Sequence, residues 1–297
     1  MDIASLQAFA AVAKHRSFSD AAEQLFLTQP AVSKRVRQLE NDLGVALFDR
    51  IGRKVSLTEA GRALLPRARR LLNDASEIRR ALADLSGDVG GRLVMGTSHH
   101  IGLHRLPEPL RAFTRSYPEV ELDIRFMDSE AACHAVVIGD LELAIVTLPP
   151  SPLPHLRLQP IWQDPLVFMI AQDHPLAGKR NVSLKTLLRE PAVLPSSSTY
   201  TRRILEQAVR KQGLSLNIAM ETNYLETLQM LAASGLGWSL LPRTQLDRRV
   251  NTVGIRGFQL SRQLGAVTHE KRSLSNAATA MIAACGAHTR AQPPRQP

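Results

Sequence analysis

The sequence is poor in the features that mark secreted and membrane proteins. It has only two cysteines in 297 residues, Cys133 and Cys285. A small secreted domain held by disulfides needs more, so we expect reduced thiols and a cytoplasmic protein. No apolar run is long enough to cross a membrane, and the N-terminus lacks a secretory signal pattern. A redox-sensing pair is the alternative that the two cysteines leave open.

The sequence also lacks a recognisable catalytic set. Residues 196–198 are all serine, but no nucleophile-elbow spacing or paired base accompanies them. His99, His100 and His104 could ligate a metal, since His100 and His104 are about one helical turn apart. No nearby cysteine or carboxylate completes the set. We therefore expect neither an enzyme nor a metal site, and we expect no cofactor.

What the sequence has in excess is positive charge. Its 37 Lys and Arg outnumber 27 Asp and Glu, which gives a formal net charge of +10. Such a balance suits an anionic partner such as DNA. The excess is spread over the chain, since residues 1–87 contribute +4 (14 against 10) and residues 88–297 contribute +6 (23 against 17). The position of the basic residues must therefore identify any DNA-binding face.

The most informative segment is residues 28–44, which has the pattern of one amphipathic helix between Thr28 and Gly44. Apolar residues recur at intervals of four, three and four, so they share a face that is predicted to pack inward. These residues are Val32, Val36, Leu39 and Leu43. Another face carries polar and basic side chains that suit base edges and phosphates in the major groove. The candidates for DNA binding on this helix are Gln29, Pro30, Ser33, Lys34 and Arg37.

The neighbours of this helix complete a DNA-binding domain. Residues 3–13 carry a helical apolar stripe that begins at Ile3, and Ser19 is the expected cap of a second short helix. Two short helices before a basic third helix form a helix-turn-helix. Residues 47–50 and 54–57 are predicted to be the strands of a wing, with Arg50 and Arg53 as further DNA contacts. An Arg at a narrow tip suits the minor groove.

These motifs together resemble the LysR-type transcriptional regulators. The matching runs are Phe9-x-x-Val12-Ala13, Ser17-Phe18-Ser19-x-Ala21-Ala22-x-x-Leu25, Gln29-Pro30-Ala31-Val32-Ser33, Leu39-Glu40-x-x-Leu43-Gly44, Leu47-Phe48-x-Arg50 and Leu57-Thr58-x-Ala60-Gly61. The resemblance implies an N-terminal winged helix-turn-helix (residues 1–58), a long linker helix for dimerisation (59–87) and a C-terminal effector domain. One departure is Arg16, where many members have Gly, so a positive φ there would be strained.

The linker segment has an apolar seam at alternating spacings of four and three. Its residues are Leu64, Ala68, Leu71, Ala75, Ile78, Leu82 and Leu85. Such a seam predicts a partner helix, which the resemblance places in a second, antiparallel subunit. The alternative is that the helix packs on its own C-terminal domain. Residues 88–91 contain two adjacent glycines and are the expected hinge.

The C-terminal part alternates strands and helices, which predicts parallel α/β units. Two crossings of the chain would give a two-lobed domain like a periplasmic binding protein. We expect lobe 1 to comprise residues 92–163 and 266–290, and lobe 2 residues 164–265. Residues 291–297 are rich in Pro, Gln and Arg and are expected to be a disordered tail.

Polar residues follow the predicted strands where ligands bind in such folds. The expected effector-binding residues are Thr97, Ser98, His99, His100, Thr147, Thr199, Tyr200 and Thr201. Hydroxyls and free N–H groups at helix starts favour anions. The spacing around residues 96–99 is similar to the cysteine-regulon subgroup of the family, which implies a sulfate-like anion or a small sulfur metabolite. A small carboxylate remains an equal alternative.

The best interpretation of the whole chain is a regulator whose DNA binding or bending responds to a small-molecule effector. Its expected partners are double-stranded promoter DNA, the effector, further copies in a homodimer or homotetramer, and RNA polymerase, with no membrane. A solute-binding protein would explain residues 92–297 but not the first 87. An enzyme on the α/β domain would need a catalytic set that the sequence lacks.

Overall fold

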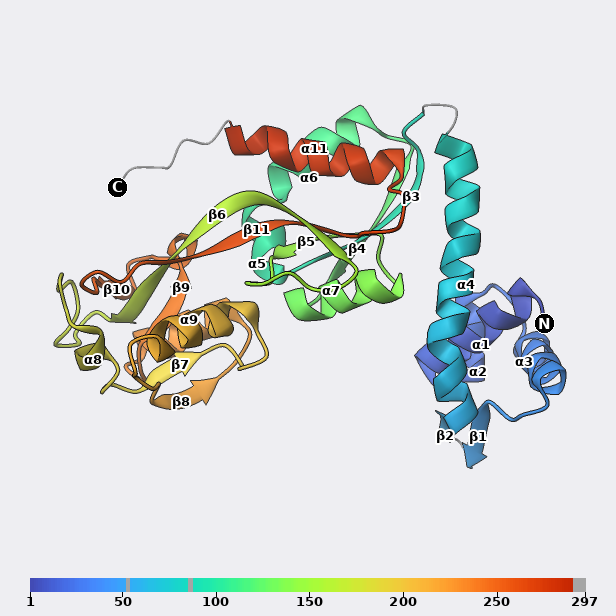
Figure 1. Ribbon diagram of the computed structural model, residues 1–297, viewed down its shortest axis with the longest axis horizontal. Coiled ribbons are helices and arrows are strands. Elements are labelled where there is room, and N and C mark those ends of the chain that lie inside the picture. The colour runs from blue at the N-terminus through green and yellow to red at the C-terminus, as the bar shows by residue number, and fades with distance from the viewer. Residues whose placement is uncertain (52–53, 85–87, 291–297) are drawn as a thin grey trace. The chain divides into compact units, whose positions relative to one another are not determined.

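The computed structural model describes residues 1–51, 54–84 and 88–290 (Figure 1). The chain divides between residues 86 and 87 into two compact units, apart from residues 138–140, which group with the first. The expected tail, residues 291–297, lies outside the described residues. No helix in the described part has the length and apolarity that crossing a bilayer requires.

The first unit is the winged helix-turn-helix that the sequence predicts, followed by a long helix. Its elements are α1 (Ile3–His15), α2 (Phe18–Gln24), α3 (Gln29–Leu43), β1 (Phe48–Ile51), β2 (Lys54–Leu57) and α4 (Glu59–Asp84). The two wing strands pair antiparallel. Phe48 of the wing contacts Phe9 of α1 and Phe18 of α2, with ring centroids 5.4 and 5.8 Å apart. This aromatic cluster fixes the wing to the helices.

The predicted inward stripes are correct in their centres and wrong at their ends. Val32, Val36 and Leu39 of α3 are fully buried. Leu43 is 39% exposed and Ile3 is 43% exposed, because each lies at a helix end beyond the edge of the small core. The prediction that Leu43 packs inward was wrong, and the stripe of α1 is buried only from Leu6 onward.

The helix ends differ in detail from the sequence prediction. Ser17, not Ser19, caps α2, and its hydroxyl accepts a hydrogen bond from the Asp20 backbone N–H. Thr28 is the N-cap of α3 but makes no capping hydrogen bond with its side chain. Arg16 has φ 54° and ψ 26° and ends α1 in the left-handed conformation. Many members of the resembled family have Gly at this position, and Arg16 is strained there because it carries a Cβ.

One face of α4 packs on the helix-turn-helix domain and another is left uncovered. Ala68 is fully buried in the core of the domain, and Leu64 and Leu72 pack against it. Leu71 is 49% exposed and Ile78 is 63% exposed. The predicted seam thus divides, since its first residues serve the subunit's own N-terminal domain. Leu82 and Leu85 have no described side chains.

The second unit has two lobes joined by long strands, as the sequence predicts. Lobe 1 contains β3 (Gly91–Thr97), α5 (His99–His104), α6 (Pro107–Ser116), β4 (Val120–Phe126), α7 (Ser129–Ile138), β5 (Leu143–Thr147) and α11 (Asn276–Arg290). Lobe 2 contains α8 (Leu184–Leu187), β7 (Ala192–Leu194), α9 (Tyr200–Arg210), β8 (Ile218–Glu221), α10 (Leu225–Ala233), β9 (Ser239–Pro242), the short 3₁₀ helix η1 (Arg243–Gln245) and β10 (Val250–Val253). The strands β6 (Leu156–Ala171) and β11 (Leu260–His269) run between them.

Alternation along the strands gives each lobe two apolar layers. Leu143 and Ile145 of β5 join the cluster under α6 and α11, whereas Ala144 and Val146 join the cluster under α7. In Figure 1, α6 and α11 lie above the strands and α7 below them. Lobe 2 repeats this scheme with α8 and α9 on one face and α10 on the other. Both faces of each lobe are covered by helices, which explains the continuous apolar runs of the central strands.

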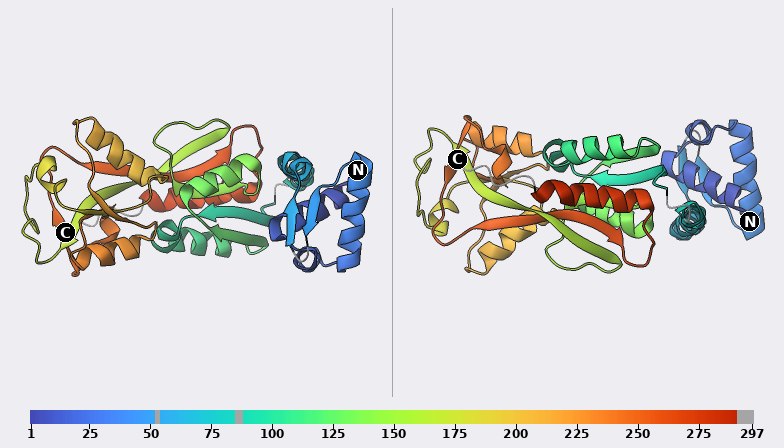
Figure 2. Two further views of the ribbon diagram at one scale, coloured as in Figure 1. Left: turned by 90° about the horizontal axis from the view of Figure 1, so that it is seen from below. Right: turned by 90° about the horizontal axis from the view of Figure 1, so that it is seen from above.

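The topology corrects one prediction, because only part of the sheet is parallel. β3 pairs parallel with β4 and β5, and β7 pairs parallel with β8. β6 is a single long strand that pairs antiparallel with β9, β10 and β11. Figure 2 shows β6 and β11, lime and orange, running side by side between the lobes. Their register shifts between Leu264 and Gly265, where a Cβ would collide with the Gln159 carbonyl oxygen.

The exposed face of α4 leads to a prediction about assembly. Replacing Leu71 and Ile78 together with Asp should leave the monomer folded, since both side chains face solvent within the subunit. The double variant should lose the wild-type dimer in light scattering, because a helix pair would then bury unpaired charge. Arg70→Asp, on a neighbouring face of α4, is the control. If light scattering gave the double variant the same oligomer mass as the wild type, this face of α4 would not be the interface.

Candidate functional site

The outer face of α3 presents a basic, polar surface beside the turn that precedes it. Gln29, Pro30, Lys34 and Arg37 are exposed, and the inner face of the helix holds the domain core. The described part of the N-terminal unit thus exposes amide and cationic side chains, the chemical types that bind base edges and phosphates. All four side chains lie on the solvent-facing side of α3, as their predicted DNA-binding role requires.

Ser33 differs from its prediction. It is 5% exposed and lies under the surface of α3, where the Arg37 guanidinium donates a hydrogen bond to its hydroxyl at 3.4 Å. Its position next to Val32 and three residues before Val36 turns it toward the core. Ser33 therefore supports Arg37 in this structure and does not present its hydroxyl outward.

The wing residues are only partly described. Arg50 belongs to β1, where it is paired with Val55 of β2. Arg53 lies outside the described residues. The Glu40 carboxylate of α3 accepts a hydrogen bond from the Leu47 backbone N–H at 2.8 Å and so ties the start of the wing to the helix. The start of the wing is thereby held against the C-terminal part of α3.

The second unit contains a cavity of about 630 Å³ between its lobes. From lobe 1 it is lined by Ser98, His99, His100, Thr147 and residues 126–130, and from lobe 2 by Pro195, Ser196, Thr199, Thr201 and residues 222–226. Arg262 of the crossing strand β11 also lines it. The cavity thus gathers six of the eight residues that the sequence singled out for effector binding.

The other two predicted residues face elsewhere. Thr97 is fully buried, and its hydroxyl donates to the Ile145 carbonyl at 2.9 Å, which joins β3 to β5. Tyr200 is 3% exposed and packs with Cys133 and Val136 of lobe 1 in the cluster under α7. Residue identity at a strand end does not reveal on which side a hydroxyl points. Both residues have structural roles in this conformation.

A buried charge cluster reaches the cavity through Arg262. The Asp164 carboxylate, 1% exposed, accepts hydrogen bonds from the Arg262 Nε at 2.8 Å and from the Arg105 Nη2 at 3.3 Å. Arg262 Nη1 donates to the Thr201 hydroxyl at 3.0 Å. Its Nη2 is buried and has no hydrogen-bond partner among the described residues. Two guanidinium groups share one carboxylate, which leaves a donor and a positive charge at the cavity.

Two carboxylates of lobe 1 cross the cavity to lobe 2. Glu130 accepts a hydrogen bond from the Tyr200 backbone N–H at the start of α9, and Asp128 accepts one from the Asn223 amide at 2.8 Å. Burial raises the pKa of the Glu130 carboxyl, and nearby Asp128 adds to this effect. The start of α9, which the sequence predicts to be part of an anion site, therefore already binds the Glu130 carboxylate.

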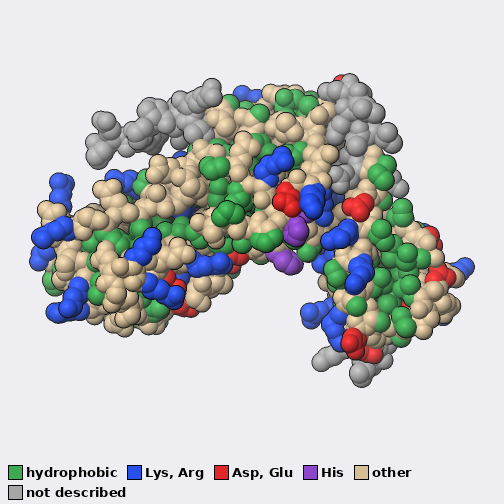
Figure 3. Space-filling view, viewed as in Figure 1, with side chains coloured by type: hydrophobic (Ala, Val, Ile, Leu, Met, Phe, Trp, Pro, Cys, Tyr) green, Lys and Arg blue, Asp and Glu red, His purple; other side chains and the backbone are tan. Residues whose placement is uncertain are grey.

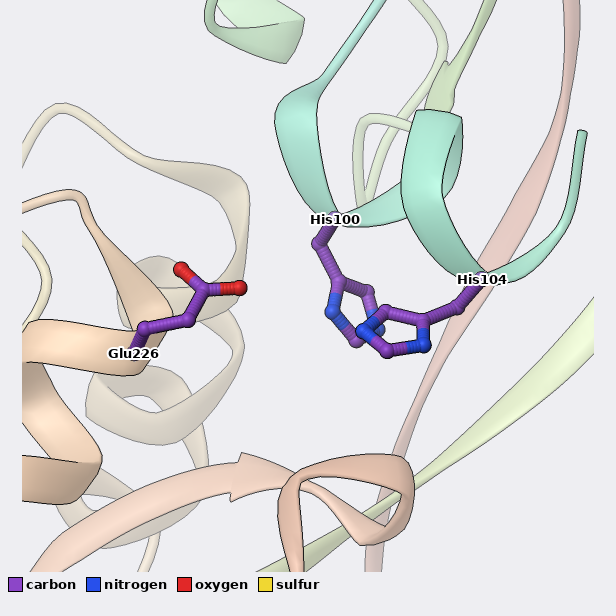
Figure 4. A group of neighbouring side chains, drawn as sticks. All are labelled: His100, His104 and Glu226. Atoms are coloured by element: carbon purple, nitrogen blue, oxygen red, sulfur yellow. The ribbon is translucent and has the colours of Figure 1, made fainter.

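His100, His104 and Glu226 form a second cluster across the lobes (Figure 4). Their potential ligand atoms lie within 4.8 Å of one another. Glu226 is the carboxylate that sequence inspection could not supply, because it is distant in the chain. The His100 ring already accepts from the Gln245 amide at Nδ1 and donates to the Thr244 hydroxyl from Nε2, each at 3.2 Å. These hydrogen bonds join His100 of lobe 1 to lobe 2, and they need no metal ion.

The charge state of His100 follows from its surroundings. Burial and the Arg262 guanidinium lower the pKa of its imidazole to about 3. The ring is therefore neutral at physiological pH, which agrees with one donating and one accepting nitrogen. Among the described residues that line the cavity, Arg262 is the arginine, and no lysine accompanies it.

The two cysteines lie apart in the core. Cys133 of α7 and Cys285 of α11 are both buried, in the clusters on opposite faces of the lobe 1 sheet. Burial raises the pKa of both thiols, that of Cys285 to about 12. A disulfide between them would require lobe 1 to open, so this conformation does not support the alternative of a redox-sensing pair.

Comparisons with known proteins agree with this architecture. Residues 3–62 match the bacterial regulatory helix-turn-helix model of the lysR family, and residues 86–290 match the LysR substrate binding domain. The chain is 30% identical over 290 residues to the HTH-type transcriptional activator CmpR of Synechocystis, covering 96% of this chain and 95% of CmpR.

Solved structures share the fold at lower identity. A full-length variant of OxyR from Pseudomonas aeruginosa has a TM-score of 0.72 at 22% identity, covering 96% of this chain and 98% of OxyR. Full-length CbnR in complex with its target DNA has a TM-score of 0.67 at 22% identity, covering 97% of this chain and 100% of CbnR. With both family models matched in order along one polypeptide, the chain belongs to the LysR family of transcriptional regulators.

Proposed function

We propose that this regulator binds promoter DNA with α3 and the wing, and that a small oxoanion or carboxylate between the lobes changes its DNA binding or bending. The proposed DNA contacts are Gln29, Pro30, Lys34, Arg37, Arg50 and Arg53, with Ser33 acting through Arg37. The exposed polar face of α3 supports this proposal, as does the likeness to CbnR, whose structure contains its target DNA.

The unpaired Arg262 Nη2 is the observation that carries the effector proposal. A buried guanidinium N–H without a partner is costly, and an anion in the adjacent cavity would satisfy it. Thr147 and Ser98 on the lobe 1 side would supply hydroxyl donors beside it. A planar oxoanion or carboxylate matches the geometry of guanidinium N–H groups.

The distribution of charge favours the same class of ligand. Residues 164–265 contain 13 Lys and Arg and 7 Asp and Glu, a net of +6, so lobe 2 holds the whole excess of the C-terminal half. Lys and Arg side chains gather over lobe 2, at the left of Figure 3. A positive field around one wall of a cleft raises the local concentration of small anions.

The two lobe-bridging carboxylates suggest how binding is coupled to conformation. An anion that approaches Arg262 and the start of α9 is repelled by Glu130 and Asp128. Binding would therefore displace the Glu130 carboxylate from the Tyr200 N–H and alter the angle between the lobes. Because lobe 1 follows the linker helix in the chain, across the proposed hinge at 88–91, such a change could reach the DNA-binding domains of an oligomer.

The proposed assembly is a homodimer through α4, extended to a homotetramer by effector domains, with RNA polymerase as a further partner at the promoter. We assign each proposed function to one of the segments defined from the sequence. DNA binding belongs to residues 1–58, dimerisation to 59–87, hinge motion to 88–91 and effector binding to residues 92–163, 164–265 and 266–290.

The DNA contacts are tested by substitution and salt titration. Lys34→Ala and Arg37→Ala should each weaken binding to every duplex. Each should also lower the steepness of log affinity against log salt by about 1, because fewer counterions are released when a phosphate contact is missing. Gln29→Ala should relax base preference instead. Lys185→Ala, an exposed lysine of lobe 2, is the control. Wild-type affinity and slope in the Lys34/Arg37 double variant would refute the interface.

The anion site is tested by a thermal-shift screen of sulfate, phosphate, bicarbonate and small carboxylates. A ligand at 100 times its Kd should stabilise the protein by about 2.7 kcal/mol. Thr147→Val should abolish this shift with little loss of basal stability. Thr97→Val should lower the stability by about 1 kcal/mol, because the Ile145 carbonyl loses its partner, yet keep the shift. If no anion shifts the wild type, or if Thr147→Val responds normally, the proposed site is wrong.

The proposed competition predicts an opposite effect at Glu130. Glu130→Gln removes a negative charge from the cavity while keeping the shape of the side chain, so the identified anion should bind more tightly, by about fivefold. Glu108→Gln, on the exposed surface of α6, is the matched control. Isothermal titration that gave weaker or unchanged binding to Glu130→Gln would contradict displacement by the anion.

A further inference from the structure

The turn between α2 and α3 places an aromatic residue in an unfavourable setting. Phe26 follows the C-cap Leu25, and its backbone N–H donates to the Glu23 carbonyl at 3.1 Å. The Leu27 N–H donates to the Ala22 carbonyl at 2.9 Å. These two hydrogen bonds form a Schellman motif with Phe26 at the C′ position.

Phe26 fits this position poorly in two respects. Its φ is 53°, in the left-handed region, where Gly or Asn is preferred and a Cβ causes strain. Its side chain is 96% exposed, the highest value among the exposed large apolar residues of the described chain. A glycine would serve the turn better, and the ring gains no packing in return. Neither feature helps the subunit fold.

The neighbours of Phe26 indicate what covers its ring. It lies two residues before Thr28, the N-cap of α3, and residues 28–30 are also exposed. The N-terminal part of a recognition helix is the part that meets base edges, so the preceding turn lies at the rim of the groove. Apolar surface is available there from thymine methyl groups and deoxyribose rings.

We propose that Phe26 is a DNA-contact residue whose ring packs on deoxyribose or thymine methyl groups at the edge of the groove that α3 enters. This inference rests on the proposed DNA interface of α3. It adds a contact of different chemistry, because the ring excludes water and releases no counterions. The strain and exposure in the free protein are then offset only in the complex with DNA.

The test compares four variants on a duplex enriched by the wild-type protein from a random pool. Phe26→Gly should raise the thermal midpoint by about 2 °C because it relieves the positive φ. It should weaken binding about tenfold, since about 60 Å² of apolar contact is lost. Phe26→Ala should weaken binding equally without the gain in midpoint, whereas Phe26→Leu should retain most of the affinity. Ile3→Ala removes a partly exposed apolar side chain, 43% exposed, from α1 and is the control.

The salt dependence separates this contact from the phosphate contacts. The slope of log affinity against log salt should stay at its wild-type value in Phe26→Gly. Affinity within twofold of wild type in Phe26→Gly and Phe26→Ala would overturn the inference, as would a fall in affinity that merely follows a fall in stability. If the wild type enriches no duplex, the proposed function itself fails, and the two failures are therefore distinguishable.

Discussion

The antiparallel pairing of β6 with β11 is the interaction on which the effector domain depends. These two strands are the only elements in the described chain that contribute to both lobes, and each brings one member of the buried Asp164–Arg262 ion pair. The pair therefore lies where the lobes pivot and where the cavity has its wall. In the proposed mechanism, an anion that satisfies the Arg262 Nη2 would act on the strands that join the lobes as well as in the binding site, and could thereby influence the angle between the lobes.

The cavity is shaped by opposing charges that are incompletely matched. Asp164 holds two guanidinium groups on one side, whereas Glu130 and Asp128 reach across from lobe 1 on the other. Each side is stabilised by hydrogen bonds, yet the guanidinium side keeps a spare donor and the carboxylates keep a spare negative charge. This balance is the basis of the proposed rearrangement, in which a bound anion would replace the Glu130 carboxylate.

The N-terminal domain also contains residues whose backbone conformation is unfavourable for folding. Its core of aliphatic and aromatic side chains is well formed, while two of its turns hold non-glycine residues, Arg16 and Phe26, at positive φ. Local backbone strain of this kind persists only where the surrounding structure imposes it. At Phe26 the strain coincides with full exposure beside α3, and this coincidence makes the turn a part of the proposed DNA interface.

The sequence by itself determined the order of domains, the wing, most helices and the polar face of α3. Those features depend on local periodicity and on motifs that are contiguous in the chain. The sequence did not reveal that β6 is one long antiparallel strand, because crossing strands and buried strands have the same apolar pattern. It also placed Ser33, Thr97 and Tyr200 at the wrong surfaces. Tertiary structure alone brought Arg262, Glu130 and Glu226 to the cavity, since contacts between residues far apart in the sequence leave no local pattern to read.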